Sequence, residues 1–468
     1  MKPERPRAAV RVMPARRPLG IFIALFILTA AAIAMLASGA SGQMRPARRG
    51  DLPAIDAKTQ AAVIDSITAA LMETYVFADK AARMDSLLRA NLAAGAYRSL
   101  TDPADFMARL QEDVAKIYFD KHMGMAALPP GTAIPNPADV DPYASEEFRE
   151  QMRRSNYAFK KAEILPGNIG YVKFNQFVDT DLAGPTAAAA MGFVANADAL
   201  IIDLRENGGG NASMIQLLAG YLFKDSVHLI DWYSRRNDET TQSWSNDWVP
   251  GKTMFDTPVY VLVSGFTGSA AEEFTFDLKN QKRATIVGET TGGAGNTVEF
   301  RVYDVGSFLA GLKLPNAQAL DPETKRGWEA IGVAPDIAVP ADKALAAAHV
   351  DAIKKLEEKA KDEGAKATLA WARVALECEL APYTPGAKEL KQYAGAYGPR
   401  KFFMEGSKLV YQREGRPKIV LVPMRKDLFG AEGLDYFRVR FTRDASGAVD
   451  AAVGMYDDGR EDRNPKGK

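Results

Sequence analysis

Two short apolar runs constrain the fold of this 468-residue chain more than any other feature. Residues 199–204 read Ala-Leu-Ile-Ile-Asp-Leu, and residues 259–263 read Val-Tyr-Val-Leu-Val. Apolar runs of this length without alternation predict strands that are buried on both faces of a sheet. Each run is followed by a turn containing glycine and then by a helical pattern, at 214–222 and at 269–281. Strands that alternate with helices predict an α/β core, which we place at 163–347.

The chain before this core has a different residue pattern. Residues 51–128 favour a helical domain, because apolar residues recur there at helical spacing and Thr101-Asp102-Pro103 is typical of a helix start. Five prolines between positions 129 and 142 then predict a linker over 129–162.

The chain after the core has two segments of different composition. Residues 348–384 are rich in Ala, Lys and Glu and predict a helical connector. Residues 385–468 carry short alternating segments between Gly and Asp turns, which predict a separate all-β module, a small barrel or sandwich.

The first 42 residues have the pattern of a targeting segment. Basic residues precede the apolar run 20–37, and small residues follow it. This pattern predicts a signal peptide, or an uncleaved signal anchor that tethers the protein to a membrane. Either alternative exports the body of the chain, to a bacterial periplasm or the cell exterior.

Charge and composition exclude several function classes. Lys and Arg total 59, as do Asp and Glu, and the basic start leaves the remainder mildly acidic, so no basic field favours nucleic acid. One cysteine, Cys378, excludes an internal disulfide framework and a multi-cysteine metal site. The three histidines are too scattered for a zinc helix. We therefore expect neither a metal nor an organic cofactor.

A glycine-rich turn follows the first apolar run, at Asp203-Leu204-Arg205-Glu206-Asn207-Gly208-Gly209-Gly210. Its backbone can approach a ligand closely and point N–H groups outward. No Gly-Lys-Ser/Thr follows, so a phosphate-binding P-loop is excluded. A plain strand-to-helix turn and an oxyanion hole both remain compatible with the pattern.

Three further residues have side chains suited to catalysis. Ser269 begins a predicted helix, where its hydroxyl could serve as a nucleophile, although Ser269-x-x-Glu272 also matches a capping box. His122, in Asp120-Lys121-His122, can transfer protons near pH 7 or can be structural. Glu329 could orient an imidazole or be a solvated charge.

Together these motifs resemble one family in order and flanking sequence. From about residue 56 to 348 the chain resembles the tail-specific or carboxyl-terminal processing serine proteases. Within them it is most similar to the branch that contains interphotoreceptor retinoid-binding protein repeats and the tricorn core protease. The blocks that carry the resemblance are 75–77, 120–122, 163–171, 203–210, 267–274, 287–293 and 332–336.

The resemblance implies a fold and a set of roles. It implies a Clp-protease/crotonase-like ββα spiral core, with Ser269 as nucleophile, His122 as base and Glu329 as the acidic third member. Gly209 and Ala270 fall where the family forms its oxyanion hole. The lysine of the family's Ser–Lys branch is replaced by Ala294, so a dyad is rejected. About forty residues separate His122 from position 163, too few for the PDZ domain that dyad members carry there.

These roles predict an exported serine peptidase that acts on peptides or proteins. Two alternatives remain open from the sequence. The retinoid-binding repeats hold apolar ligands on the same fold, so the chain could be a non-catalytic binding protein. An esterase or amidase could also use the same three residues.

Overall fold

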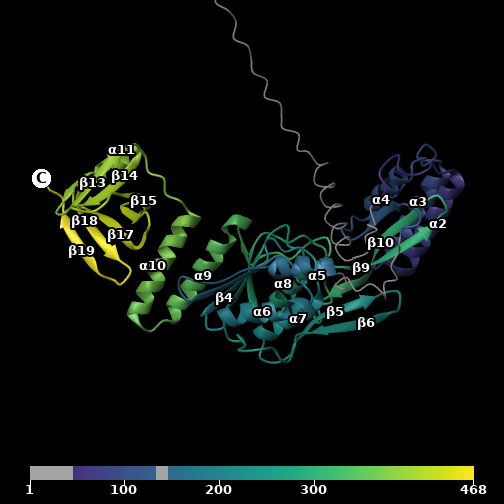
Figure 1. Cartoon of the computed structure of the whole chain (residues 1–468), viewed down its shortest axis with the longest axis horizontal. Coiled ribbons are helices and arrows are strands. Elements are labelled where there is room, and N and C mark those ends of the chain that lie inside the picture. Colours follow the sequence, from purple (N-terminus) through teal and green to yellow (C-terminus); the bar gives the residue numbers. More distant parts are fainter. Residues whose placement is uncertain (1–45, 133–145, 468) are drawn as a thin grey trace, which may run out of the picture.

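The computed structural model describes residues 46–132 and 146–467. The expected signal peptide or anchor at 1–42 and much of the proline-rich stretch lie outside these ranges. Within them, no helix combines the length and the apolar character needed to cross a membrane. Figure 1 shows an elongated chain, with the helices α2–α4 at one end and the C-terminal β-module at the other.

A six-stranded sheet forms the middle of the molecule, in the order β11-β8-β7-β4-β3-β2. Its strands are β2 (Phe159–Leu165), β3 (Ile169–Phe174), β4 (Ala199–Asp203), β7 (Val259–Val263), β8 (Ala284–Gly288) and β11 (Ile337–Ala338). All neighbours pair in parallel except β2 with β3. The two apolar runs form β4 and β7, which are adjacent and buried at every residue. The predicted α/β class is thus confirmed.

Helices cover both faces of this sheet. On one face lie α6 (Thr180–Val194), α7 (Ala212–Leu222) and α8 (Ala270–Asn280), and on the other lies α9 (Ala344–Lys359). Successive strand residues point to opposite faces, so Leu200 packs with the first group and Ile201 with α9. A strand covered on both sides is mostly apolar, which explains the two runs, and the buried Asp203 at the end of β4 is bonded to Tyr171 and Arg205.

The parallel order brings three loops to one edge of the sheet. Because β4, β7 and β8 are neighbours, their carboxyl ends lie together, and the loops 204–211, 264–269 and 289–296 leave from that edge. In open α/β sheets, ligands bind at the carboxyl ends of the strands. We therefore expect a functional site at this edge.

A second sheet joins the central region to the N-terminal region. Its order is β1-β10-β5-β6, and β9 also pairs with β10. The strands are β1 (Gly124–Leu128), β5 (His228–Ser234), β6 (Glu239–Trp244), β9 (Thr297–Asp304) and β10 (Leu309–Leu320). The first half of β10 pairs with β1 and its last residues pair with β5, so one strand belongs to both regions.

The N-terminal helices pack against this second sheet. They are α2 (Ala57–Thr74), α3 (Ala78–Ala93) and α4 (Pro103–Ile117). The Asp102 side chain caps α4 and Pro103 occupies its first turn, as the sequence predicts. Their buried core includes Phe308, Leu312 and Leu314, which come from β10 or the turn before it. The helical domain expected at 51–128 therefore contains β1 and is completed by strands from far along the chain.

The described part of the expected linker 129–162 contains regular structure. Helix α5 (Glu146–Arg154) is followed by the 3₁₀ turn η1 (Asn156–Ala158), and β2 then begins. Phe148 and Met152 lie one helical turn apart and are both buried in the core under the central sheet. Prolines dominate only the start of this stretch, so the central region begins earlier than position 163.

The C-terminal part begins with α10 (Glu363–Leu380), which packs on α9. The β-module follows, with eight strands that each pair antiparallel with the next along the chain. Its elements are α11 (Ala387–Leu390), η3 (Lys391–Tyr393), β12 (Gly395–Tyr397), β13 (Arg400–Glu405), β14 (Lys408–Arg413), β15 (Ile419–Arg425), β16 (Leu428–Ala431), β17 (Leu434–Arg443), β18 (Val449–Tyr456) and β19 (Glu461–Pro465); η2 (Ala341–Lys343) precedes α9. The module has its own buried aromatic cluster.

Candidate active site

Ser269 lies at the carboxyl edge of the central sheet, where the loop after β7 becomes α8. Its backbone has φ 53° and ψ −125°, a conformation that few residues other than glycine adopt. Such a conformation costs about 1–3 kcal/mol and is concentrated at functional sites. The capping box expected from the sequence is present, and the Glu272 carboxylate accepts a hydrogen bond from the Ser269 N–H at 3.0 Å.

Gly209 packs directly against the start of α8. A Cβ at position 209 would lie 2.6 Å from Ser269 Cβ and 2.9 Å from Ala270 N, and φ is +108°. Both observations exclude any larger side chain there. The structure therefore brings together three of the predicted site residues, Ser269, Gly209 and Ala270, although they come from two different loops.

The hydrogen-bond partner of the Gly209 N–H differs from the one expected. The resemblance assigns it to the oxyanion hole, yet it donates to Asn207 Oδ1 at 2.9 Å. Asn207 is fully buried and its amide donates to Phe174 O at 3.0 Å, which fixes the acceptor in place. Ala270 N lies in the first turn of α8, where N–H groups lack intrahelical acceptors. Of the two N–H groups expected to form the oxyanion hole, that of Gly209 is thus engaged by Asn207, and the role of Ala270 stays a prediction.

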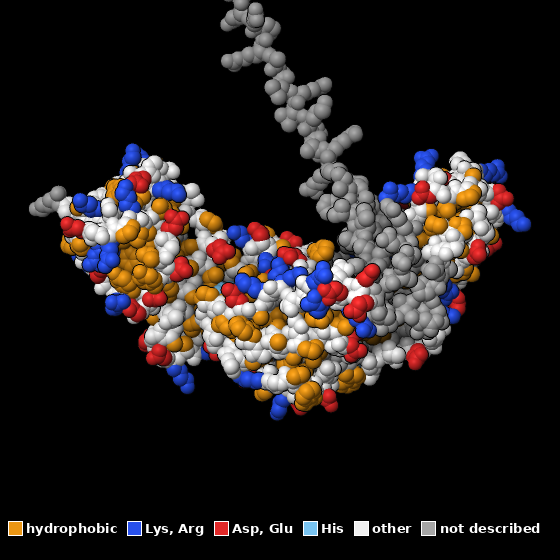
Figure 2. Space-filling view, viewed as in Figure 1, with side chains coloured by type: hydrophobic (Ala, Val, Ile, Leu, Met, Phe, Trp, Pro, Cys, Tyr) orange, Lys and Arg blue, Asp and Glu red, His pale blue; other side chains and the backbone are white. Residues whose placement is uncertain are grey.

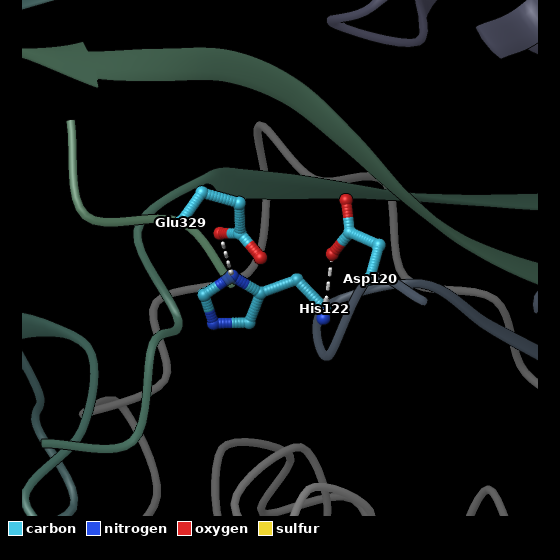
Figure 3. Close-up of side chains that lie close together, drawn as sticks. All are labelled: Asp120, His122 and Glu329. Carbon is cyan, nitrogen blue, oxygen red and sulfur yellow. Dashed lines mark hydrogen bonds and ion pairs between the residues drawn. The ribbon is translucent and has the colours of Figure 1, made fainter. Parts of the chain in front are cut away.

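His122 and Glu329 meet at the join between the N-terminal helices and the second sheet. His122 occupies the turn between α4 and β1, and Glu329 follows β10. The imidazole Nδ1 lies 4.0 Å from Glu329 Oε2, and the two side chains are 14% and 8% exposed. Figure 3 shows that the other ring nitrogen, Nε2, points away from both carboxylates. The imidazole thus has its Nδ1 edge toward an acid and its Nε2 edge directed away from both carboxylates.

Two further groups hold this turn in place. Asp120 Oδ1 accepts from the backbone N–H of His122 at 2.8 Å, and its Oδ2 accepts from the Tyr75 hydroxyl at 3.0 Å. Glu329 Oε2 accepts from the N–H groups of Gly295 and Asn296, at 2.7 and 2.9 Å. Each carboxylate is therefore oriented by fixed donors, and burial alone does not determine its position.

Burial shifts the pKa values of these groups in opposite directions. Burial, with the charge of Asp120 and others adding to it, raises the pKa of Glu329 from 4.5 to about 7. Burial lowers the pKa of His122 from 6.5 to about 3, and the nearby ammonium groups of Lys313 and Lys121 act in the same direction. The imidazole is thus a neutral base at ordinary pH, while Glu329 titrates near neutrality.

One loop connects the serine and the histidine. In the loop after β8, the N–H groups of Gly293 and Ala294 donate to Glu272, at 2.6 and 2.8 Å. The next two N–H groups donate to Glu329, as described above. Lys121 Nζ, beside His122, also donates to the carbonyl of Gly292. Four consecutive amides therefore tie the start of α8 to the acid that faces the imidazole.

The same cluster offers ligand atoms for a cation. One atom each from Asp120, His122 and Glu329 lies within 4.8 Å of the others. Both Asp120 oxygens and Glu329 Oε2 already accept hydrogen bonds from protein donors, as given above.

The sequence predicts the main side chains of the candidate site but not the residues that hold them in place. Asp120 and Tyr75 lie in two of the sequence blocks that carry the family resemblance, but only the fold shows that they are hydrogen-bonded to each other. Glu272 was recognised as a capping residue, whereas it is also the acceptor for the loop after β8 and for Thr291 Oγ1, at 2.5 Å. No local pattern could have shown that the Asn207 side chain takes the Gly209 N–H.

Comparisons with known proteins agree with the predicted family. Residues 168–339 match the model described as peptidase family S41. Residues 55–160 match the N-terminal domain of peptidase S41 in eukaryotic IRBP. The second match lies over the N-terminal region and agrees with the predicted branch.

Individual relatives match a part of their own length. The tail-specific protease of Haemophilus influenzae is 29% identical over 154 residues, which is 31% of this chain and 21% of that protein. The carboxyl-terminal-processing protease of Synechocystis sp. is 28% identical over 192 residues, 40% of this chain and 41% of that protein. Among solved structures, tricorn protease matches with 13% identity and a TM-score of 0.39, over 64% of this chain and 37% of that chain. This chain therefore spans less than half the length of these relatives.

Proposed function

We propose that the protein, whose residues 168–339 match the model of peptidase family S41, is an exported serine peptidase using Ser269, His122 and Glu329. One observation carries the proposal. A largely buried imidazole faces a largely buried carboxylate with Nδ1, on a loop network that runs to a serine in a strained backbone conformation. Nucleophilic catalysis also needs the base within hydrogen-bond reach of the serine hydroxyl, so the proposal includes the approach of His122 Nε2 to Ser269 Oγ.

In the proposed reaction, Ser269 Oγ attacks the carbonyl carbon of the scissile peptide bond. His122 Nε2 takes the hydroxyl proton and later gives it to the leaving amine, and a water molecule then repeats the sequence on the acyl-enzyme. For Nε2 to accept that proton, the neutral imidazole must carry its own hydrogen on Nδ1, which faces Glu329 Oε2 and donates to it. The present 4.0 Å separation shortens by about 1 Å to make that bond, because apo sites commonly hold their catalytic hydrogen bonds long.

Charge on the substrate oxygen would be stabilised by the Ala270 N–H at the start of α8. The helix terminus adds a favourable dipole at the same position. Gly209 becomes the second donor of the proposal only if its N–H turns from Asn207 Oδ1 toward the substrate. Removing one such donor typically lowers the rate by about 10²–10³.

Substrate class and location follow from the family and from the first 42 residues. Peptides or proteins are the proposed substrates, and the targeting pattern supports export, with the apolar run 20–37 as a cleaved signal or a membrane tether. Neither inference invokes a cofactor, because serine, base and acid are sufficient for the chemistry.

Covalent labelling tests the proposal. A fluorophosphonate probe should label the wild-type protein and should fail to label Ser269→Ala, with Ser264→Ala as a matched control on the same loop. Hydrolysis of peptide and ester libraries then separates a peptidase from an esterase. A wild-type protein that is folded, unlabelled and inactive on both libraries would instead support a binding protein.

A further inference from the structure

The contact between α10 and the β-module is loosely packed. Helix α10 has no buried residue, although it lies between α9 and the module. Two hydrogen bonds join it to β17: the Trp371 indole N–H donates to Asp435 O at 3.0 Å, and Arg438 Nη2 donates to Trp371 O at 2.6 Å. Polar contacts therefore hold the two parts together around unfilled space.

That space includes a cavity of about 290 Å³. Its wall is mainly apolar and aromatic on the helix side and includes charged groups on the module side. The charged residues of the wall are Arg438, Arg460, Asp457 and Glu461, of which the last three are exposed and Glu461 pairs with Arg440 at 3.0 Å. The apolar residues on which the proposal depends are Trp371 and Val374. Figure 2 shows apolar side chains gathered on the visible face of the C-terminal module, with Lys and Arg beside them. A cavity of this size holds one amino-acid side chain or a small organic molecule.

Arg438 is the unusual member of the wall. It is only 6% exposed, and its guanidinium carbon lies 3.8 Å from the centre of a Trp371 ring. Among the described residues no carboxylate lies within ion-pair distance of it, and its one hydrogen bond goes to a backbone carbonyl. A guanidinium has five N–H donors, so most of its donor capacity is unused.

Two other arginines of the module each have the carboxylate partner that Arg438 lacks. Arg400 is 1% exposed and pairs with Asp462 at 2.5 Å. Arg443 pairs with Asp427 at 2.7 Å. Buried charges in proteins are normally paired in this way, because an uncompensated charge in a poorly solvated place is unfavourable. Consistent with that cost, burial lowers the pKa of Arg438 to about 10.

We propose that this cavity binds a carboxylate attached to a small apolar body, with the carboxylate on Arg438 and the apolar part against Trp371 and Val374. A planar guanidinium can hold a carboxylate with two parallel hydrogen bonds, and the Trp371 ring keeps that plane oriented. The C-terminal residue of a peptide and a free short-chain acid share this chemistry. The site lies outside the proposed catalytic machinery and does not depend on it.

Calorimetric titration of the full-length protein tests the site. N-acetyl-L-leucine represents a peptide terminus, hexanoate represents a free acid, and N-acetyl-L-leucinamide lacks the charge. We expect saturable binding of at least one acid and at least tenfold weaker binding of the amide. If neither acid binds below 10 mM, or if the amide binds as well as its acid, the proposal is wrong.

Variants tie the binding to the cavity. Arg438→Gln should weaken binding at least tenfold, whereas Arg413→Gln, which removes an exposed arginine from β14, should leave it unchanged. Val374→Phe should also abolish binding by filling the space while Arg438 remains. Circular dichroism and thermal melting check that each variant is folded. A folded Val374→Phe protein with undiminished binding would overturn the assignment, as would equal losses in the two arginine variants.

Discussion

The two halves of the candidate site are built in different ways. The nucleophile half, Ser269 with Gly209 and Ala270, rests on neighbouring parallel strands of one buried sheet. The base half, His122 with Glu329, comes from the turn before β1 and from the chain after β10, where two regions of the molecule join. The first half is positioned by close backbone packing, and the second by hydrogen bonds to carboxylates.

This difference indicates which contacts of the site can change when a substrate binds. Close packing between Gly209 and Ser269 leaves no room for a side chain at position 209. The His122–Glu329 contact, at 4.0 Å, is open by about 1 Å relative to a hydrogen bond. We infer that substrate binding closes the His122–Glu329 contact, whereas the nucleophile half needs only the Gly209 N–H to turn from Asn207.

The largest effect should come from removing either reactive group. Ser269→Ala and His122→Ala should each lower kcat for a peptide by about 10⁴–10⁶, and the double variant should be no worse, because the groups act as a unit. Stability should change by at most about 1 kcal/mol for Ser269→Ala, because the bond to Glu272 comes from the backbone N–H and is kept in the variant. Steady-state kinetics with thermal melts measures both. His228→Ala, at a histidine outside the site, is the control, and full activity in Ser269→Ala would exclude the proposed mechanism.

Glu329→Gln should have the next largest effect, about 10²–10⁴ in kcat/KM, since a neutral amide cannot stabilise the imidazolium. In the wild type, activity should rise with pH through about 7 as Glu329 ionises, because His122 with its pKa near 3 is already neutral there. The variant should lack this rise. An unchanged inflection near pH 7 in Glu329→Gln would assign the titration to another group.

The same pKa shift affects stability. A carboxyl whose pKa is 4.5 when unfolded and about 7 when folded destabilises the protein progressively as pH rises through that window. Glu329→Gln should therefore gain melting temperature relative to wild type between pH 5 and pH 8. A constant difference across that range would contradict the raised pKa.

A smaller loss should follow from Glu272→Gln, which tests the link between the halves. The Glu272 carboxylate accepts bonds from Ser269, Gly293 and Ala294, and the adjoining amides of that loop hold Glu329. We expect a loss of about 10–10² in kcat/KM, together with a destabilisation of about 1–3 kcal/mol. Glu289→Gln, in an exposed part of the same loop, is the matched control. If Glu272→Gln alters stability alone, the two halves are independent.

The smallest effect should come from deleting the β-module. A chain that ends at Leu380 keeps both halves of the site and loses a module with a separate buried core. Turnover of a short peptide should stay within about threefold of wild type. Peptide kinetics and melting of the two chains test this. Loss of turnover in a truncated chain that remains folded would assign the module a part in the active site.

The sequence predicted what depends on local patterns. Unbroken apolar runs identified β4 and β7, and the Asp102-Pro103 start of α4 was readable from capping chemistry. The family resemblance predicts the roles of Ser269, His122 and Glu329, and these roles stay predictions. The pairing of β10 with β1 and β5 was not predictable, because register between distant strands depends on tertiary packing. For the same reason the competing acceptor on Asn207 was missed.

The shared strand β10 also sets an order of assembly. Helices α2–α4 are synthesised well before β10, which supplies Leu312 and Leu314 of the apolar face against which they are buried. Pairings over such long sequence separations are slow to form, because a large loop must close before any contact stabilises it. The N-terminal helices must therefore wait, partly uncovered, until the central sheet is nearly complete. Newly made chains are then most open to proteases and chaperones over residues 57–117, and the base half of the site is the last part of the enzyme to mature.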